Sequence, residues 1–410
     1  MDAKQTEPKQ VLLVSASMDV GKRFESAIGE SNSRWALHSA ATHKEALGYL
    51  ATGRALDAVL VDLTNLDLKG TDLLKEAVIR QPGALRIGLA APLPEGKTSP
   101  LAYAPTHQIV PSESPPRAWV ATLARAFAAQ NILSHDHFKK LLSGLQTLPV
   151  LPQIYTEVMD ELESEDPSLE RAGEIVSRDM GLSARLLQMV NSAYFGLKRA
   201  ANSPGEAVMF LGTEMTKALV LSLKVFAQFD HLKSPELNLE QLWRQSWSTA
   251  VVARGLCREE GAEPAVINDA FMAGLLHKAG ILVFAANFPE YFKATLQYSI
   301  RKKTTFWEAE YQFYNASHAE LGAYLFSLWG MPDGMIEAIA YHNRPMLAKP
   351  RSFCALTALH VANALASDDT DERALRNQPI DREYLRCTGA LDRLENWQKL
   401  VPTLLTPGKK

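Results

Sequence analysis

The chain has 410 residues, of which 47% are apolar and 22% charged, and a formal net charge of −3. This composition is ordinary for a globular protein, and the length predicts two or three domains. The slight negative charge and the lack of a basic stripe in the sequence argue against nucleic-acid binding. Three widely separated cysteines without a CxxC spacing argue against a disulfide framework or a zinc site.

No targeting or membrane segment is expected. Residues 1–10 are a polar tail without the apolar stretch of a signal peptide. The most apolar stretch, 271–288, is interrupted by His277 and Lys278, so it predicts a buried core helix rather than a membrane span. The sequence therefore predicts a cytoplasmic protein.

The first third of the chain alternates strand-like and helix-like segments. Short apolar runs predict strands at 11–15, 35–40, 58–61, 85–89 and 108–110. Amphipathic stretches between and after them predict helices at 20–30, 44–51, 71–80 and 117–131. Strands alternating with helices are typical of a flavodoxin-like, doubly wound α/β domain, expected at residues 10–131.

From residue 132 onward, apolar residues recur at three- and four-residue spacing, which predicts an all-α bundle at 132–366 and a helical extension and tail at 367–410. The expected helices are 169–178, 182–194, 205–229, 239–259, 267–286, 306–328, 332–342, 352–366 and 381–400. Because 117–144 has neither Pro nor Gly before its last residue, the helix at 117–131 is expected to continue into the bundle.

One polar residue marks the α/β segment. Asp62 directly follows the predicted strand at 58–61, and Gly70 lies eight residues further on. Sites in open α/β sheets form at the carboxyl ends of the strands. In order and spacing, the segment 57–70 resembles the phosphoacceptor segment of response-regulator receiver domains.

The resemblance places five receiver positions on this sequence. Asp62 takes the position of the phosphorylated aspartate, and Ser15 and Ala16 take those of the acidic pair that holds Mg²⁺. Ala90 takes the position of the Ser/Thr that reports phosphorylation, and Pro111 that of the lysine that pairs with the phosphoryl group. Because Ser15 and Ala16 cannot supply carboxylate oxygens to Mg²⁺, Asp62 is predicted to be a vestige rather than a phosphoacceptor.

The helical part carries four histidines at helical positions, and a lone histidine there is most often a satisfied core residue. They are His277, His318, His342 and His360. Upstream motifs give them a context: LPVLP at 148–152, SRDMGLSARLL at 177–187 and VNSAYFG at 190–196. With SPGEA and FLG further on, these motifs resemble the HDOD domain, a helical signalling output module related to HD-type phosphohydrolases, over residues 138–365.

The resemblance also places the metal ligands of HD hydrolases on this chain. The first His position falls on Gln245, the His-Asp pair on His277 and Lys278, and the late Asp on Asn363. Two carboxylates are lost, and the ammonium of Lys278 stands where a metal would bind, so repulsion disfavours a cation. No metal, no cofactor and no catalysis are expected, in agreement with the view of HDOD domains as inactive.

Two interpretations of Lys278 stay open. Its ammonium can replace the metal as the local cation and hold a carboxylate such as Glu320 or an anionic ligand. Alternatively, the long side chain can extend to solvent, which is the favoured interpretation from the sequence. The burial of Lys278 distinguishes between them.

The run 191–196 contains a candidate partner surface. Its members are Asn191, Ser192, Tyr194 and Phe195. The same run can instead end a helix, with Asn191 satisfying backbone groups and Gly196 as a left-handed cap. The segment 178–185 could form a helix-turn-helix, although two helices around a glycine are common in any bundle.

Together these features predict a non-catalytic signal-transduction protein that acts as a protein-binding scaffold or adaptor in bacterial two-component or cyclic-dinucleotide signalling. The expected partners are other signalling proteins and a second copy of the chain, docked through helix 117–131. Neither nucleic acid nor a membrane is expected to bind. Two alternatives stay open: a residual metal-dependent phosphohydrolase acting on a nucleotide, and a nucleic-acid regulator.

Overall fold

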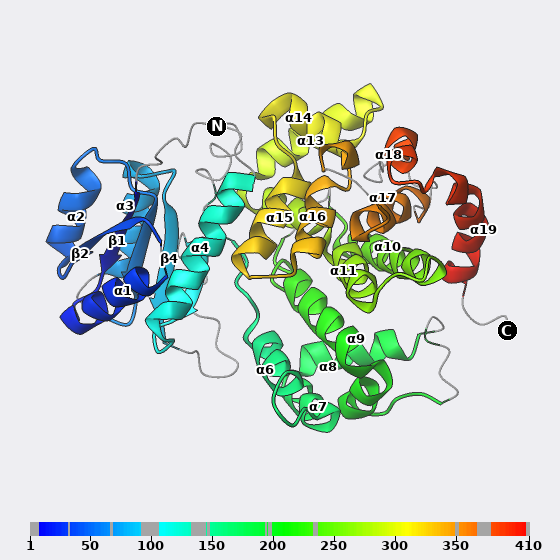
Figure 1. The fold of residues 1–410 in the computed structure, drawn as a ribbon, viewed down its shortest axis with the longest axis horizontal. Helices are drawn as coiled ribbons and strands as arrows, with labels where there is room; N and C mark the ends of the chain where they lie inside the picture. Colours follow the sequence, from blue (N-terminus) through cyan, green and yellow to red (C-terminus); the bar gives the residue numbers. More distant parts are fainter. Residues whose placement is uncertain are drawn as a thin grey trace. The chain divides into compact units, whose positions relative to one another are not determined.

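A computed structural model of the chain describes residues 8–31, 33–65, 69–91, 106–132, 145, 148–192, 195, 199–232, 237–348, 352–366 and 379–406. The chain divides into two compact units (Figure 1). The first comprises Met1–Val150 with two short segments, Tyr314–Ala316 and Ser327–Gly330, and the second comprises the rest from Leu151 to Lys410.

The first unit is built on a five-stranded parallel sheet in the order β2-β1-β3-β4-β5. The strands are β1 Lys9–Val14, β2 Trp35–Ala40, β3 Ala58–Asp62, β4 Leu85–Ala90 and β5 Gln108–Pro111. The helices are α1 Met18–Glu30, α2 His43–Ala51, α3 Gly70–Arg80 and α4 Pro116–Ile132. This is the flavodoxin-like order, so the predicted fold class of this unit is confirmed.

Burial explains why these segments form the sheet. Every residue of β4 is buried, and so are Val11–Val14 and Ala58–Val61, as parallel strands covered by helices on both faces require. Helices α1 and α4 pack together, and α2 packs with α3. The two pairs cover the two faces of the sheet (Figure 1).

The helix predicted at 117–131 corresponds to α4. Its apolar stripe lies inside its own unit: the ring centroids of Phe24 and Trp119 are 5.8 Å apart, and those of Trp35 and Phe127 are 5.4 Å apart. Dimerisation through α4 would therefore use its outer face. The predicted continuation of this helix past 132 falls on 133–144, which lie outside the described residues.

The described part of the chain from residue 151 onward is helical, as predicted (Figure 1). The helices are α6 Gln153–Leu162, α7 Leu169–Ser177, α8 Met180–Val190, α9 Pro204–Ala227, α10 Leu239–Glu259, α11 Pro264–Leu276, α12 Ala279–Asn287, α13 Pro289–Lys302, α14 Phe306–Tyr314, α15 His318–Leu328, α16 Asp333–Tyr341, α17 Ala355–Leu365, α18 Arg382–Cys387 and α19 Leu394–Leu405, with 3-10 turns at Pro345–Leu347 and Leu391–Arg393.

Several long predicted helices are in fact two. The stretch 267–286 forms α11 and α12, 306–328 forms α14 and α15, and 381–400 covers α18 and most of α19. Helix α9 also contains a non-helical residue, Gly212, with φ 74°. Apolar residues continue through these breaks because both flanking segments are buried, so the spacing alone does not reveal them.

The most apolar stretch lies in the core. Among the described residues, Pro264–Asn287 alone is long and apolar enough to cross a membrane, and 83% of its apolar 18-residue window is buried inside the protein. The prediction of a core segment is confirmed, but the chain turns at His277 and Lys278 instead of forming one helix.

Candidate functional site

The five receiver positions lie together at the carboxyl edge of the sheet. Ser15 and Ala16 follow β1, Asp62 ends β3, Ala90 ends β4, and Pro111 ends β5. Because β1 and β3 are neighbours in the sheet, Ser15 lies beside Asp62. The five positions therefore share one edge, as parallel strands require.

The carboxylate of Asp62 is held by neutral donors. The Ser15 hydroxyl donates to Oδ2 at 3.1 Å. The backbone N–H and the hydroxyl of Thr64 donate to Oδ1 at 3.0 and 2.6 Å. Both carboxylate oxygens of Asp62 therefore accept hydrogen bonds. Among the five receiver positions, only Asp62 carries a carboxylate. Thr64 had not been identified from the sequence.

A second set of polar side chains lies in the core of the helical unit. We call it the polar cluster. Its members are His277, Lys278, Glu310, His318, His342 and Asn363, each at most 7% exposed. They come from the turn between α11 and α12, from α14, from the start of α15, from the end of α16 and from α17.

Of the four positions predicted for HD metal ligands, the position of His277 is the one that carries the residue type found in HD hydrolases. Its Nδ1 lies 2.8 Å from the Gly274 carbonyl, to which it donates, and its Nε2 lies 3.2 Å from Oδ1 of Asn363. A neutral ring that donates from Nδ1 accepts at Nε2 once the Asn363 amide turns its NH2 toward the ring. The nitrogen that a metal would take thus faces an amide. Burial, followed by the charges of Lys278 and His342, holds the pKa of His277 well below its ordinary value.

His342 and His318 extend this arrangement. The ring centroids of His277 and His342 are 5.1 Å apart, and those of His342 and His318 are 5.8 Å apart. Nδ1 of His342 donates to the Ile339 carbonyl at 2.8 Å. Burial, then the nearby His318, keeps the pKa of His342 well below its usual value. All three imidazoles are therefore neutral near pH 7.

Lys278 is 5% exposed, so the interpretation in which its side chain extends to solvent is wrong. Burial lowers the pKa of its amine to about 8. Its charge in turn lowers the pKa values of His277, His318 and His342. A buried amine therefore lies close enough to these three imidazoles to affect their charge.

Glu310 and His318 form a buried pair that sequence analysis missed. Oε2 of Glu310 lies 2.7 Å from Nδ1 of His318 and accepts the His318 backbone N–H at 3.1 Å. Burial raises the pKa of Glu310 well above its usual value, and burial followed by the charge of Lys278 lowers that of His318 to about 3. Both shifts favour the neutral acid and the neutral imidazole over an ion pair.

Glu320, the proposed partner of Lys278, has a capping role. Its Oε2 accepts the Ser317 backbone N–H and the Tyr311 hydroxyl, each at 2.8 Å. This satisfies a free N–H at the start of α15. Glu320 therefore helps to fix the start of α15 in the helical unit.

Gln245 and His360 are not counted in the polar cluster, although His360 borders it. Gln245 is half-buried on α10 and forms no hydrogen bond with another described residue. His360 bonds through Nδ1 to the His342 carbonyl and accepts the Asp381 N–H at Nε2, both at 2.8 Å. His360 is thus a satisfied core histidine. No group of three or more His, Cys, Asp or Glu with the geometry of a metal site occurs among the residues that the structure describes.

Part of the candidate partner surface at 191–196 stabilises the local structure of the chain. Asn191 ends α8, and its side chain bonds both the N–H and the carbonyl of Ala201, at 2.7 and 2.9 Å. The Ser192 carbonyl accepts the Phe195 N–H at 3.2 Å. Tyr194 and Gly196 lie outside the described residues. Asn191 therefore holds the segment that leads into α9.

Comparison with known proteins finds a family match over part of the helical unit. The HDOD domain model matches residues 148–345. An uncharacterized protein of Treponema pallidum (strain Nichols) is 28% identical over 226 residues, which is 54% of this chain. This chain spans 43% of the length of that relative.

Two solved structures share the fold. An HDOD domain protein of unknown function from Geobacter sulfurreducens has a TM-score of 0.50 and 21% identity, over 69% of this chain and 98% of its own. The second structure is a protein from Marinobacter aquaeolei VT8 that is described provisionally as a signal transduction protein. It has a TM-score of 0.50 and 17% identity, and the match covers 85% of this chain and 77% of that protein. Residues 148–345 are thus an HDOD domain, related to HD phosphohydrolases, and an α/β region of receiver-like topology precedes it in the chain.

Proposed function

We propose that the chain is a non-catalytic signalling scaffold whose HDOD domain binds other signalling proteins. The single observation that carries the proposal is the state of the former metal position. Lys278 is buried where HD hydrolases have an aspartate, and Nε2 of His277 faces Asn363 at 3.2 Å. A divalent cation would lose carboxylate ligands and meet an ammonium.

The α/β region supports a role without phosphoryl chemistry. Asp62 is held by the Ser15 and Thr64 hydroxyls, and Ala16 and Pro111 supply neither a metal ligand nor a cation. The region would instead serve docking. A homodimer through α4 would use exposed residues such as Ala121 and Ala124, since the apolar stripe of this helix is buried in its own unit.

The proposed setting is two-component or cyclic-dinucleotide signalling in the bacterial cytoplasm. The motifs at 177–187 and 190–196 and the match to the HDOD family support it. The proposal includes neither nucleic-acid nor membrane binding, because the formal charge of −3 offers no basic footprint. Co-purification from a native extract, followed by size exclusion of the complex, would identify the partner.

Metal analysis and a hydrolysis assay separate this proposal from a residual phosphohydrolase. The full chain is incubated with Mn²⁺, Mg²⁺ or Fe²⁺, desalted, and assayed for bound metal and for hydrolysis of a panel of nucleotides and cyclic dinucleotides. We expect neither stoichiometric metal nor turnover above a Lys278→Met variant. The triple variant Gln245→His, Lys278→Asp, Asn363→Asp is the gain-of-metal control. Stoichiometric metal or turnover in the unaltered chain would overturn the proposal.

Phosphorylation of Asp62 is tested separately. The chain is mixed with a small phosphodonor and Mg²⁺, and acyl-phosphate is measured by intact mass. We expect no stable adduct, since nothing at this edge neutralises the incoming charge. A Ser15→Asp, Ala16→Asp, Pro111→Lys variant restores the missing charges as a comparison. An adduct that Asp62→Asn abolishes in the unaltered chain would refute this part.

A further inference from the structure

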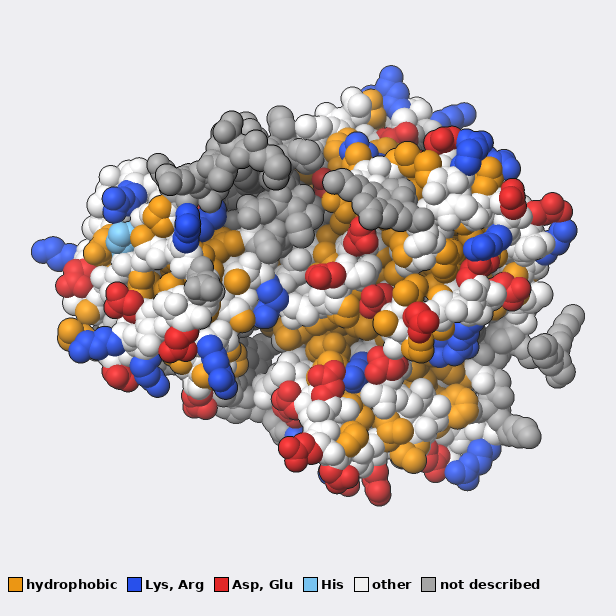
Figure 2. Space-filling view, viewed as in Figure 1, with side chains coloured by type: hydrophobic (Ala, Val, Ile, Leu, Met, Phe, Trp, Pro, Cys, Tyr) orange, Lys and Arg blue, Asp and Glu red, His pale blue; other side chains and the backbone are white. Residues whose placement is uncertain are grey.

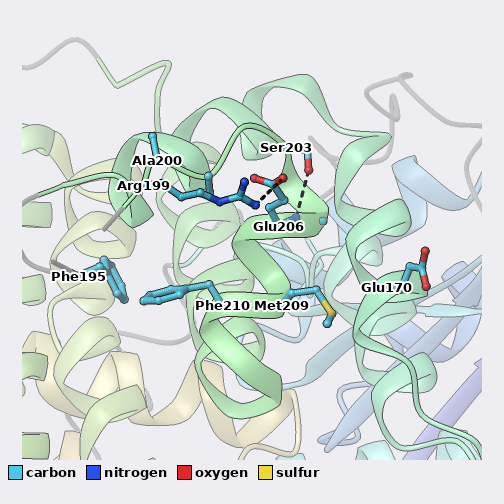
Figure 3. Close-up of a pocket in the computed structure, with 10 residues that line it drawn as sticks. Glu170, Phe195, Arg199, Ala200, Ser203, Glu206, Met209 and Phe210 are labelled. Carbon is cyan, nitrogen blue, oxygen red and sulfur yellow. Dashed lines mark hydrogen bonds and ion pairs between the residues drawn. The ribbon is translucent and has the colours of Figure 1, made fainter. Parts of the chain in front are cut away.

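A surface groove lies between α7, α9 and the segment that enters α9, entirely within the helical unit (Figure 3). Its volume is about 940 Å³. The lining residues are Glu170, Phe195, Arg199, Ala200, Ala201, Ser203, Gly205, Glu206, Met209 and Phe210. It is separate from the polar cluster, because none of the cluster residues lines it.

The floor of the groove is apolar and accessible. Phe210 and Met209 of α9 are 48% and 58% exposed, although both are large apolar side chains. Figure 3 shows the Phe195 and Phe210 rings pointing toward one another and Met209 pointing toward Glu170. The ring centroids of Phe195 and Phe210 are 6.1 Å apart, and Phe195 also packs on Trp247 at 5.8 Å. Exposed apolar side chains gathered in one groove are typical of a binding surface.

The walls of the groove are held in place by hydrogen bonds. Asn191 fixes Ala201 with two of them. Ser203 and Glu206 form the reciprocal cap at the start of α9: the Ser203 hydroxyl accepts the Glu206 N–H at 3.1 Å, and the Glu206 carboxylate accepts the Asn202 N–H at 2.9 Å. Helix α7 can lie close because Gly173 meets Gly205 backbone to backbone. The groove is therefore preorganised.

The flank of the groove is strongly acidic. Between Gln153 and Asp179 the sequence has nine Asp or Glu and two Arg, a formal charge of −7 in a chain whose total is −3. Figure 2 shows acidic side chains gathered over α6 and α7. Glu170 and Glu174, one turn apart on α7, are exposed and form no ion pair with any residue in the described ranges. These two carboxylates are free to meet a partner.

We propose that this groove binds a basic amphipathic helix of a partner protein. Apolar residues of that helix would pack on Phe195, Met209 and Phe210, and its Lys or Arg residues would face Glu170 and Glu174. The inference rests on the proposed scaffold function and names the kind of partner that it binds. It commits to a basic partner because Glu170 and Glu174 form no ion pair with a described residue, and because the stretch 153–179 keeps a formal charge of −5 when Lys217 and Lys224, which pair with Glu163 and Asp179, are counted.

A helix fits the chemistry of the groove better than an extended strand does. The described surface here comes from helices and a capped turn, so no strand edge offers a row of free backbone groups for pairing. An amphipathic helix needs only apolar anchors at i, i+3, i+4 and i+7 and charge at its rim. Phe195, Phe210 and Met209 form such a row, with Glu170 at its end (Figure 3).

Fluorescence anisotropy with the full chain tests the proposal. The probe is a labelled peptide of about 18 residues with Leu on one helical face and Lys elsewhere. Two peptides serve as references: one of the same composition, scrambled so that it has no apolar face, and one with Glu in place of Lys. We expect binding of the first peptide alone, and we expect its affinity to fall as salt rises.

Matched variants locate the site. Met209→Ser and the pair Glu170→Lys, Glu174→Lys are each expected to raise Kd at least fivefold, as loss of an anchor or of a charged rim does. Met180→Ser removes an apolar side chain that is 86% exposed and does not line the groove. Glu25→Lys changes an exposed carboxylate of the α/β unit. Both control variants are expected to bind like the unaltered chain.

Three results would overturn the groove proposal: equal binding of the scrambled or acidic peptide, unchanged Kd in the groove variants, or self-association of the chain that Met209→Ser abolishes, which would make a second copy the occupant. The scaffold function is judged separately. If Met209→Ser still retains a signalling protein that co-purifies with the unaltered chain, the scaffold stands and the groove is not its docking site.

Discussion

At the scale of the residue, the polar cluster contains three of the four positions at which the sequence resemblance predicts HD ligands. They are His277, Lys278 and Asn363. Within the cluster, the His277 ring donates to the Gly274 carbonyl from Nδ1 and meets the Asn363 side-chain amide at Nε2. The Glu310–His318 pair adds a buried acid that carries its own proton.

Replacement of Glu310 tests whether that acid is neutral. Because burial keeps Glu310 protonated, Glu310→Gln reproduces the neutral side chain, and we expect no loss of unfolding free energy at pH 7. Glu310→Ala leaves the His318 N–H and Nδ1 without an acceptor and should cost about 1–3 kcal/mol. Urea denaturation of the two variants measures the difference. A Gln variant as unstable as the Ala variant would show that Glu310 is charged.

Lys278 makes stability depend on pH in the alkaline range. Its folded pKa is about 8, against an ordinary 10.5. Between these values the unfolded chain holds a proton on the amine and the folded chain does not, so this group makes unfolding free energy rise with pH. Below pH 8 the buried charge costs about 3 kcal/mol.

We therefore expect the stability of Lys278→Met, relative to the unaltered chain, to be highest below pH 8 and to decline toward pH 10. The change in packing between the lysine and methionine side chains adds an offset that does not vary with pH. Urea denaturation at several pH values measures the difference, and the exposed Lys302→Met is the control. A difference that stays constant from pH 7 to 10 would contradict a depressed pKa.

At the scale of the element, glycine decides how closely the helices of the HDOD domain pack. A Cβ on Gly280, near the start of α12, would lie 1.9 Å from the His318 carbonyl oxygen and 2.8 Å from the Gly322 nitrogen of α15. In both cases the neighbouring atom belongs to the backbone, which cannot turn aside as a flexible side chain can. The position of His318 in the polar cluster thus depends on this glycine.

Gly280→Ala is expected to lower the free energy of unfolding by about 3 kcal/mol, because the helices must separate to admit the methyl group. The matched control is Gly48→Ala in α2, where nothing lies within 4 Å of the added Cβ. That variant should gain about 0.5–1 kcal/mol from helix propensity. Urea denaturation of the full-length variants compares them, and equal effects would refute the packing argument.

At the scale of the whole molecule, the buried histidines predict sensitivity to acid. His277, His318 and His342 all have lowered pKa values. Below pH 6.5 the unfolded chain binds protons on these rings that the folded chain does not, so stability falls as pH decreases. Each ring contributes about 1.4 kcal/mol per pH unit. Glu310 acts in the opposite direction, because above pH 4.5 its raised pKa makes the folded chain hold a proton that the unfolded chain has lost. Its effect on the unfolding free energy offsets that of one of the three histidines.

Unfolding free energy measured between pH 7 and 5 should therefore fall steeply. His342→Gln should flatten the slope, and His231→Gln, an exposed histidine, should leave it unchanged. A slope that is the same in all three proteins would mean that the buried rings do not control acid stability.

The sequence by itself determined the two fold classes and the placing of the receiver positions. Strand ends in a parallel sheet share one edge, so Ser15, Asp62, Ala90 and Pro111 had to lie near one another once the strands were identified. The long motifs at 177–187 and 190–196 were sufficient to identify the HDOD domain, and the substituted HD positions followed from it.

Only the tertiary structure decided the burial of Lys278, the Glu310–His318 pair and the groove beside α7. These depend on which helix faces which, and spacing along one helix carries no information about its neighbours. For the same reason Gly212 and the turn at His277 interrupt stretches whose apolar pattern runs on without a break. Burial sets charge and access, and it arises only when segments distant in the sequence pack together.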